Sequence, residues 1–173
     1  MEGAGSRRVS PVARSGLIVA IATLILDQAS KLWLLHVFDL GRRGLVQVLP
    51  FFDLILAWNT GISYGWFSDS GPTGQILLLG FKIVAVIALT VWMVRAHTRL
   101  ATIALGLIIG GAIGNAIDRF AYGAVVDFAL LHAEIGGKTY NWYVFNVADV
   151  AIVAGVAALL YDSFFGAPAV KAP

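Results

Sequence analysis

Long apolar runs alternate with shorter polar segments along this chain. Four stretches are mostly apolar, at about 16–37, 74–96, 100–117 and 144–165. An α-helix needs about 20 mostly apolar residues to cross the hydrocarbon core of a bilayer. The pattern therefore predicts four transmembrane helices in a single membrane-embedded domain that covers residues 1–173.

The segments between these helices have a different character. Residues 38–73 contain "LVQVLPFFDLILAW", in which β-forming residues run on either side of a Pro-Phe-Phe break. This pattern is typical of short strands, so we expect a small β-rich unit on the outer membrane surface. The end of the chain, "GAPAVKAP" at 166–173, is predicted to be disordered.

Composition supports a lipid environment. Of the 173 residues, 59% are hydrophobic and 13% are charged, whereas about a quarter of the residues of a soluble domain are charged. The chain has no cysteine, which excludes disulfides and thiolate metal sites. The net charge of +2 is small and forms no basic stripe, which argues against a nucleic-acid partner.

Basic residues predict the orientation in the membrane. More basic residues lie on the side of the termini than on the other side. The side of the termini has Arg7, Arg8, Arg14, Arg95, Arg99 and Lys171, and the other side has Arg42, Arg43 and Lys138. Because Lys and Arg favour cytoplasmic loops, both termini are expected in the cytoplasm. Residues 38–73 and 118–143 then face outward.

Glycines recur every four residues in the third helix, at Gly106, Gly110 and Gly114. Such a stripe lets a neighbouring helix approach closely, and this is our interpretation of Gly106. Gly110, Gly111 and Gly114 lie nearer to polar residues. There the missing side chains could also leave room for a substrate.

Ionisable residues at membrane depth are costly and usually mark function. Asp27 and Lys31 are four apart on one helix face and can pair; alternatively, they only fix helix packing. Asn115, Asp118 and Arg119 lie at the outer end of the third helix. These three residues either serve a site or satisfy loop carbonyls.

Two further acids have no neighbouring cation in the sequence. Asp149 follows Asn146 by three residues at the start of the fourth helix, where it could simply cap the helix or interact with its dipole. Asp127 lies in the apolar run "GAVVDFALL". Two carboxylates at close range share a proton, so one can activate water while the other donates to a carbonyl. This chemistry needs no metal, and the scattered histidines suggest no metal site.

Four boxes in order carry a resemblance to a known family: "DQASKLW" (27–33), "WNTGISYGWF" (58–67), "GGAIGNAIDRFAYGAVVDF" (110–128) and "FNVADVAI" (145–152). The chain resembles the lipoprotein signal peptidases, the signal peptidase II family. The resemblance implies an all-α integral membrane protein with four transmembrane helices, a small extracytoplasmic β-rich cradle and a short periplasmic helix. We expect the cradle at 38–73 and the short helix near 129–142.

The resemblance also implies residue roles. Asp127 and Asp149 would be catalytic. Supporting or substrate-binding roles would fall to Asp27, Lys31, Asn59, Gly61, Asn115, Asp118, Arg119 and Asn146. One departure is that Ile62 and Ser63 follow Gly61, where the family often has small alanines. The bulk of Ile62 would alter the substrate groove.

The implied reaction is cleavage of a diacylglyceryl-modified prolipoprotein just before its lipidated cysteine. It would occur near the periplasmic face of the bacterial inner membrane, without cofactor or metal. The expected partners are the prolipoprotein and membrane lipid, and the chain is expected to act as a monomer.

Two other readings of the buried charges are a small proton-coupled transporter and a non-catalytic scaffold. Lys82 is the best feature for transport, but a transporter should show broken helices or an internal repeat, and the sequence shows neither.

Overall fold

The computed structural model describes residues 11–60 and 71–165. The helical elements are α1 (Pro11–Leu32), a π-helical continuation η1 (Trp33–Val37), α2 (Leu40–Arg43), α3 (Gly71–Arg95), α4 (Arg99–Tyr122) and α5 (Val147–Phe165). The strands are β1 (Val46–Leu49), β2 (Phe52–Asn59), β3 (Val125–Ile135) and β4 (Lys138–Asn141).

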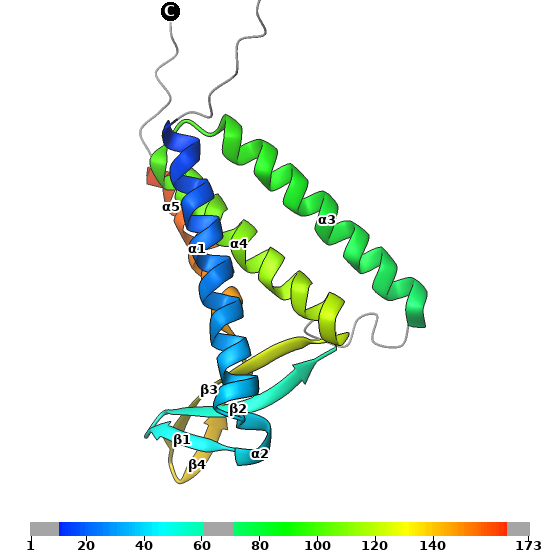
Figure 1. The fold of residues 1–173 in the computed structure, drawn as a ribbon. Helices are drawn as coiled ribbons and strands as arrows, with labels where there is room; N and C mark the ends of the chain where they lie inside the picture. Colours follow the sequence, from blue (N-terminus) through cyan, green and yellow to red (C-terminus); the bar gives the residue numbers. More distant parts are fainter. Residues whose placement is uncertain (1–10, 61–70, 166–173) are drawn as a thin grey trace, which may run out of the picture.

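The long helices form a bundle with the sheet at one end (Figure 1). α4 packs against both α1 and α5, and α3 runs along α4. The start of α1 and the end of α5 lie together at the end of the bundle away from the sheet (Figure 1). The sheet side of the bundle therefore corresponds to the side that the sequence places outside.

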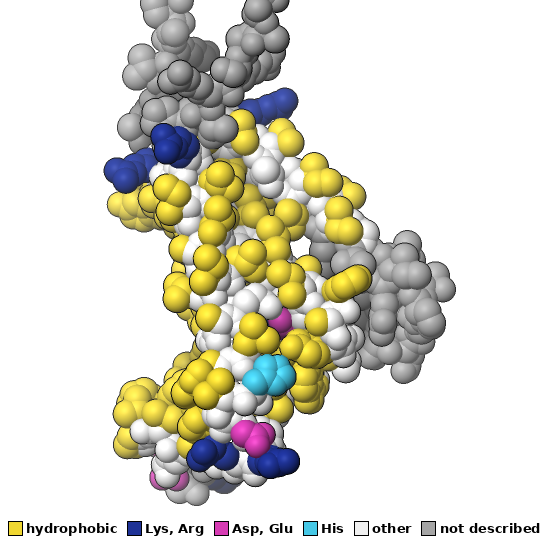
Figure 2. All heavy atoms as spheres, in the orientation of Figure 1, with side chains coloured by type: hydrophobic (Ala, Val, Ile, Leu, Met, Phe, Trp, Pro, Cys, Tyr) yellow, Lys and Arg dark blue, Asp and Glu magenta, His cyan; other side chains and the backbone are white. Residues whose placement is uncertain are grey.

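Within residues 11–60 and 71–165, three helical stretches are long and apolar enough to cross a membrane: Val12–Val37, Arg99–Tyr122 and Val147–Phe165. In α3, the apolar stretch among the described side chains is Ile83–Arg95, which is shorter than a span requires. Hydrophobic side chains cover the helical part of the visible face, and basic ones gather at its two ends (Figure 2). The protein is thus a multi-pass membrane protein, and a fourth span remains a prediction.

Glycines let α4 touch its neighbours. A Cβ at Gly106 would meet the backbone carbonyl of Gly16 in α1, and a Cβ at Gly111 would lie 2.6 Å from the Ala148 carbonyl oxygen in α5. Gly110 likewise faces the backbone of α1 at Ala20, and Gly114 faces the side chain of Asp27 in α1. The expectation that these glycines leave room for a substrate is therefore wrong, because the neighbouring helices occupy the space.

The four strands form one antiparallel sheet in the order β1-β2-β3-β4. Its buried side packs on η1 and α2 through a cluster that contains Leu34, Leu40 and Phe128. A small β-rich unit is therefore present beside the helices, as expected, but residues 38–73 supply only two of its four strands. Gly61 and Ile62 lie outside the described residues.

The prediction of a short helix near 129–142 is wrong, because these residues form most of β3 and all of β4. Gly136 and Gly137 both have positive φ, at 61° and 76°. Such a pair suits the tight turn of a β-hairpin. Among the described residues, a short helix is present instead at α2, shortly after η1.

Two of the helix boundaries that differ from the expected ones bear on the polar residues. α4 continues to Tyr122 rather than 117 and stops at Gly123, which has a φ of 73°. α5 starts at Val147 rather than 144. Asp118 and Arg119 therefore lie within α4, and Asn146 directly precedes α5.

The glycine contacts generate a stability prediction. Gly106→Ala should lower the free energy of unfolding by about 1–3 kcal/mol, the usual cost of overpacking, because its Cβ meets backbone that cannot move aside. The control is Gly80→Ala, where nothing lies within 4 Å of the new Cβ. Thermal unfolding in detergent should show a lower midpoint only for Gly106→Ala, and equal midpoints would contradict the close approach.

Candidate active site

A buried lysine lies at the centre of the polar residues. Lys31 Nζ donates to Asp27 Oδ2 at 2.8 Å and to Asn115 Oδ1 at 3.0 Å, and it forms an ion pair with Asp118 Oδ2 at 2.7 Å. The side chains of Lys31, Asp27 and Asp118 are only 2%, 0% and 1% exposed. Two carboxylates therefore compensate the buried cation.

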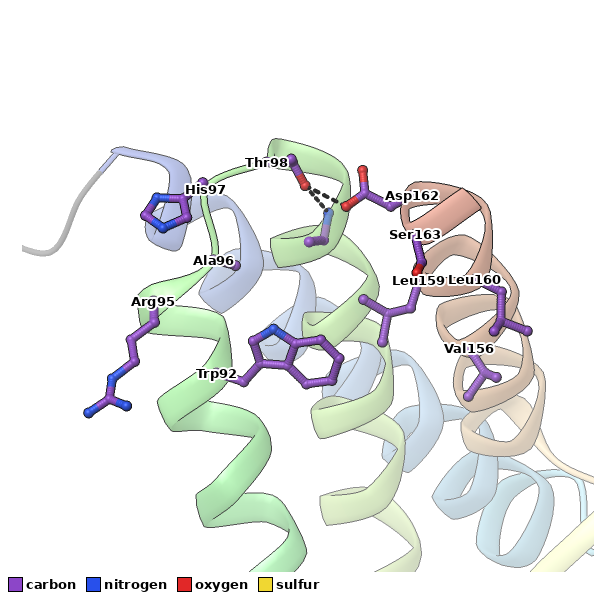
Figure 3. Close-up of a pocket in the computed structure, with 11 residues that line it drawn as sticks. Trp92, Arg95, Ala96, His97, Thr98, Val156, Leu159, Leu160, Asp162 and Ser163 are labelled. Atoms are coloured by element: carbon purple, nitrogen blue, oxygen red, sulfur yellow. Dashed lines mark hydrogen bonds between the residues drawn. The ribbon is translucent and has the colours of Figure 1, made fainter. Parts of the chain in front are cut away.

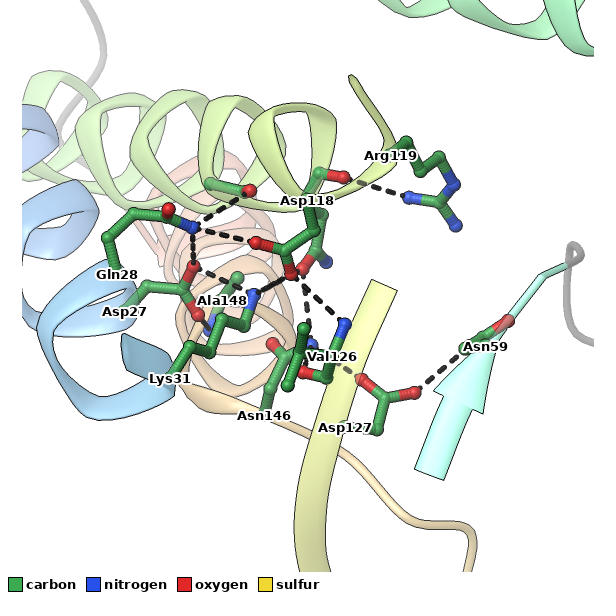
Figure 4. A network of polar contacts seen from close by, with 12 residues as sticks. Asp27, Gln28, Lys31, Asn59, Asp118, Arg119, Val126, Asp127, Asn146 and Ala148 are labelled. Atoms are coloured by element: carbon green, nitrogen blue, oxygen red, sulfur yellow. Dashed lines mark hydrogen bonds and ion pairs between the residues drawn. The ribbon is translucent and has the colours of Figure 1, made fainter. Parts of the chain in front are cut away.

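The carboxylates that pair with Lys31 also bind other elements (Figure 4). Asp27 Oδ1 accepts the backbone N–H of Ala148 in the first turn of α5, at 3.0 Å. Asp118 Oδ2 accepts the N–H of Val126 in β3, at 3.1 Å. The cluster therefore joins α1, α4, α5 and the sheet.

Asp127 lies in β3, opposite Ala57 of β2, and is 3% exposed. Its Oδ1 accepts from Asn146 Nδ2 at 2.6 Å, and its Oδ2 accepts from Asn59 Nδ2 at 3.1 Å. Both oxygens thus have an amide donor, each from a different segment (Figure 4). These two bonds hold the carboxylate in one orientation.

Asp149 lies in the first turn of α5 and forms a reciprocal cap with Asn146. The Asn146 N–H donates to Asp149 Oδ2 at 3.2 Å, and the Asp149 N–H donates to Asn146 Oδ1 at 3.0 Å. This is the arrangement of a capping box. The other carboxylate oxygen, Oδ1, accepts from Asn115 Nδ2 at 2.9 Å. The capping interpretation of Asp149 is therefore correct, but it leaves one oxygen for a further contact.

Two asparagines connect the lysine cluster to the two acids. Asn115 Oδ1 accepts from Lys31, so its Nδ2 is turned towards Asp149. Asn146 Nδ2 lies 3.1 Å from the same Asn115 oxygen and also donates to Asp127. Lys31 thereby fixes which end of the Asn115 amide meets the acids.

Burial raises the pKa of Asp127 to about 6, and the charge of Asp149 adds to the rise. The hydrogen bonds from Asn59 and Asn146 and the charge of Lys31 oppose it. A carboxyl group with a raised pKa beside a second carboxylate can hold a proton close to neutral pH. The pair can therefore contain one acid and one base.

Asp127 and Asp149 line one cavity of about 540 Å³, together with Asn59, Tyr143 and Val153. This volume lies within the usual range for ligand sites, about 300–1,000 Å³. Tyr143 and Val153 are 73% and 69% exposed. The cavity is therefore open at the surface of α5, and a reacting group can reach both carboxylates.

The structure brings together most of the residues that the sequence indicated. Arg119 lies beside the cluster, where its Nη1 is 3.3 Å from the Asn115 carbonyl oxygen. Gly61 cannot be placed, since it lies outside the described residues. His132 is instead 3.1 Å from Asp53 in the sheet. In the described part of the chain, no group of three or more His, Cys, Asp or Glu residues could hold a metal ion.

Gln28 is a site residue that the sequence analysis missed. Its Nε2 donates to Asp118 Oδ1 at 2.9 Å and lies 3.2 Å from both Asp27 Oδ2 and the Gly114 carbonyl oxygen. A second polar residue directly after Asp27, in a mostly apolar helix, was the available signal.

Comparisons with known proteins cover nearly the whole chain. The family described as Signal peptidase (SPase) II matches residues 19–165. A lipoprotein signal peptidase of Rhodopseudomonas palustris (strain ATCC BAA-98 / CGA009) is 74% identical over 165 residues, which are 95% of this chain and 100% of that protein. A lipoprotein signal peptidase of Nitrobacter hamburgensis is 71% identical over 160 residues, 92% of this chain and 98% of that protein.

Solved structures agree with this similarity. One, titled a bacterial membrane enzyme structure by the in meso method at 2.3 Å resolution, has a TM-score of 0.71 and 26% identity. It covers 92% of this chain and 95% of its own. A second of the same kind, at 1.9 Å resolution, has a TM-score of 0.72 and 25% identity. It covers 89% of this chain and 95% of its own.

The lysine cluster generates a second prediction. Lys31→Met should cost about 3–5 kcal/mol of unfolding free energy, because it leaves buried carboxylates without their cation. The control is Arg42→Met, which breaks the exposed pair with Asp39 and should cost about 0–1 kcal/mol. Thermal unfolding in detergent measures both, and a Lys31→Met protein as stable as Arg42→Met would contradict the role of the cluster.

Proposed function

This chain belongs to the signal peptidase II family, and we propose that it cleaves its substrates as an aspartic peptidase with Asp127 and Asp149 as the catalytic carboxylates. Its function is the removal of signal peptides from prolipoproteins. One observation supports the catalytic pair above all: the two carboxylates come from β3 and α5, line the same cavity and are both bonded to Asn146.

In the proposed mechanism the pair holds one proton and one water. Asp149 takes a proton from the water as its oxygen attacks the scissile carbonyl carbon. Asp127 donates its proton to the carbonyl oxygen, so a neutral tetrahedral intermediate forms. Asp149 then passes the water's proton to the leaving amine while Asp127 recovers its own, and the C–N bond breaks. The raised pKa of Asp127 supports its role as the acid.

The neighbouring residues have positioning roles in this proposal. Asn59, Asn115 and Asn146 orient the two carboxylates through the bonds described above. Lys31, with its two partner carboxylates, holds Asn115. Arg119 lies within electrostatic range of both acids and is suited to bind a substrate carbonyl.

The proposed substrate is a prolipoprotein whose cysteine already carries diacylglycerol. Its scissile bond lies where a membrane-embedded signal helix meets a lipid anchor, so the reaction must occur near a membrane surface. Asp127 lies in β3 and Asp149 in the first turn of α5, and the sheet is at one end of the bundle (Figure 1). We place this end at the periplasmic face of the inner membrane, with four spans and both termini cytoplasmic. All proposed groups come from one chain, so a monomer suffices.

The transporter alternative has little support. The paired charges around Lys31 gather at the sheet end of the bundle rather than along a path through it. The side chain of Lys82 lies outside the described residues.

Replacing either acid tests the proposed chemistry. Asp127→Asn and Asp149→Asn should each lower kcat by at least about 10²–10⁴-fold, the usual contribution of acid–base catalysis. The assay is a gel shift on purified protein with a diacylglyceryl-modified prolipoprotein, with and without a chelator. Asp53→Asn, a buried aspartate elsewhere in the sheet, is the matched control. Full cleavage by a folded dyad variant would refute the aspartic mechanism.

The pKa of Asp127 predicts the pH dependence. The pair is active with one proton, so kcat/KM should fall as pH rises through about 6, the pKa of Asp127. The Asn59 hydrogen bond lowers this pKa, so Asn59→Ala should move the falling limb to higher pH. Asn141→Ala, an exposed asparagine in β4, should leave it in place. A limb that moves to lower pH in Asn59→Ala contradicts this assignment.

A further inference from the structure

We propose that the face of α5 that begins at Asp149 is the docking groove for the helical signal peptide of the substrate, and that Asp162 at its far end binds the cationic start of that peptide. The inference rests on the proposed function, since the groove begins at the proposed catalytic pair.

One line of residues defines this face of α5. Asp149, Val153, Val156, Leu160 and Ser163 follow one another at alternating four- and three-residue intervals. This spacing puts side chains on one side of a helix, as in the seam of a coiled coil. The line is about 21 Å long, at about 1.5 Å of rise per residue.

Cavities lie at both ends of this line. Asp149 and Val153 line the cavity of about 540 Å³ that contains the acids. Val156 and Leu160 line another, of about 570 Å³, between the far ends of α3 and α5 (Figure 3). Its opposite wall includes Trp92 of α3.

No helix in the described part of the chain covers this line of residues. Val153, Val156 and Leu160 are 69%, 45% and 53% exposed. By contrast, Gly155 lies on the neighbouring face of α5, where a Cβ would be 2.6 Å from the Ala104 carbonyl oxygen of α4. α5 is therefore packed on one side and available along this line.

The dimensions of the line suit a signal peptide. Such peptides have a cationic n-region followed by an apolar h-region of about 7–15 residues. As a helix, this h-region is about 10–22 Å long, which matches the line on α5. Helices bind in apolar grooves through residues at this same spacing. The cleavage site would then lie at Asp149 and the n-region at the opposite end.

The charge at that opposite end is complementary. Asp162 lines the second cavity and accepts a hydrogen bond from Thr98 Oγ1 at 2.9 Å. Among the described residues it has no salt bridge, and Arg95 and His97 point away from it (Figure 3). This carboxylate would attract a lysine or arginine of the n-region. It would repel the phosphate of a membrane lipid, so charge favours the peptide over lipid as the occupant.

Photo-crosslinking tests the position of the peptide. A benzophenone amino acid replaces Val156 in the full-length Asp127→Asn protein, which retains the diacylglyceryl-modified prolipoprotein uncut. The control position is Val150, also on α5 and 54% exposed but off the line. We expect at least about fivefold more crosslink to the signal peptide from Val156. Equal crosslinking from both positions, or crosslinks to lipid alone at Val156, would contradict the proposed docking of the signal peptide on this face of α5.

Charge reversal tests Asp162. Asp162→Lys should raise KM about tenfold for a prolipoprotein with lysines in its n-region, with kcat within about twofold. A substrate with glutamates in their place should restore KM. The control is Asp39→Lys, which makes the same charge change on an exposed residue next to α2. Its KM for each of the two substrates should equal that of the wild type. If Asp162→Lys does not discriminate between the substrates, its proposed role is wrong.

The two proposals fail in different ways. Cleavage by the Asp127→Asn or Asp149→Asn variant would overturn the aspartic mechanism. If both of these variants are inactive but Asp162→Lys behaves like the wild type, only the proposed contact between Asp162 and the n-region is wrong.

Discussion

The buried ammonium of Lys31 is the constraint on which the rest of this structure depends. A cation at membrane depth is tolerated only where partners surround it, and here Asp27 and Asp118 supply them. Gly114 permits this arrangement, because a Cβ there would occupy the place of the Asp27 carboxylate. Asp27 accepts the N–H of Ala148 with its other oxygen, and Asp118 accepts the N–H of Val126 with the same Oδ2 that contacts Lys31. Compensation of one charge thereby sets the relative positions of α1, α4, α5 and β3.

The same network determines the geometry of the candidate active site. An amide can present either its oxygen or its nitrogen, and Lys31 selects between them at Asn115. The nitrogen of Asn115 then meets Asp149, while Asn146 contacts Asn115 and both acids. Stability and positioning are therefore properties of one set of hydrogen bonds. A change at Lys31 would affect the orientation of the acids as well as the fold.

Much of this arrangement could be predicted from the sequence. The apolar runs indicated the helices, and Asp127 and Asp149 stood out because no cation lies beside them in the chain. The sheet was harder to predict, because β2 and β3 are far apart in the sequence. Asn59, for example, lies opposite Val125. β3 is buried along its first half, so its sequence lacks the alternation that identifies a half-exposed strand.

The contacts of glycine and asparagine were beyond sequence reasoning for a different reason. A stripe of glycines predicts close packing but not which backbone fills the gap, so Gly110 and Gly111 were open to a substrate interpretation. The three-residue spacing of Asn146 and Asp149 fits both a helix cap and a functional site. The structure shows that the cap is present and that Asp149 Oδ1 points to Asn115 instead.

The capping role of Asp149 strengthens the case for a catalytic one. A carboxylate in the first turn of α5 is held by a backbone N–H and lies at the positive end of the helix dipole. Its position is therefore fixed by a regular element rather than by a loop, which is what precise chemistry requires. The helix that begins at this acid continues as the exposed line from Val153 to Ser163. A substrate helix on that line would have its cleavage site at Asp149 and its start near Ser163. The distance between these two residues along α5 would therefore select the length of the signal peptide.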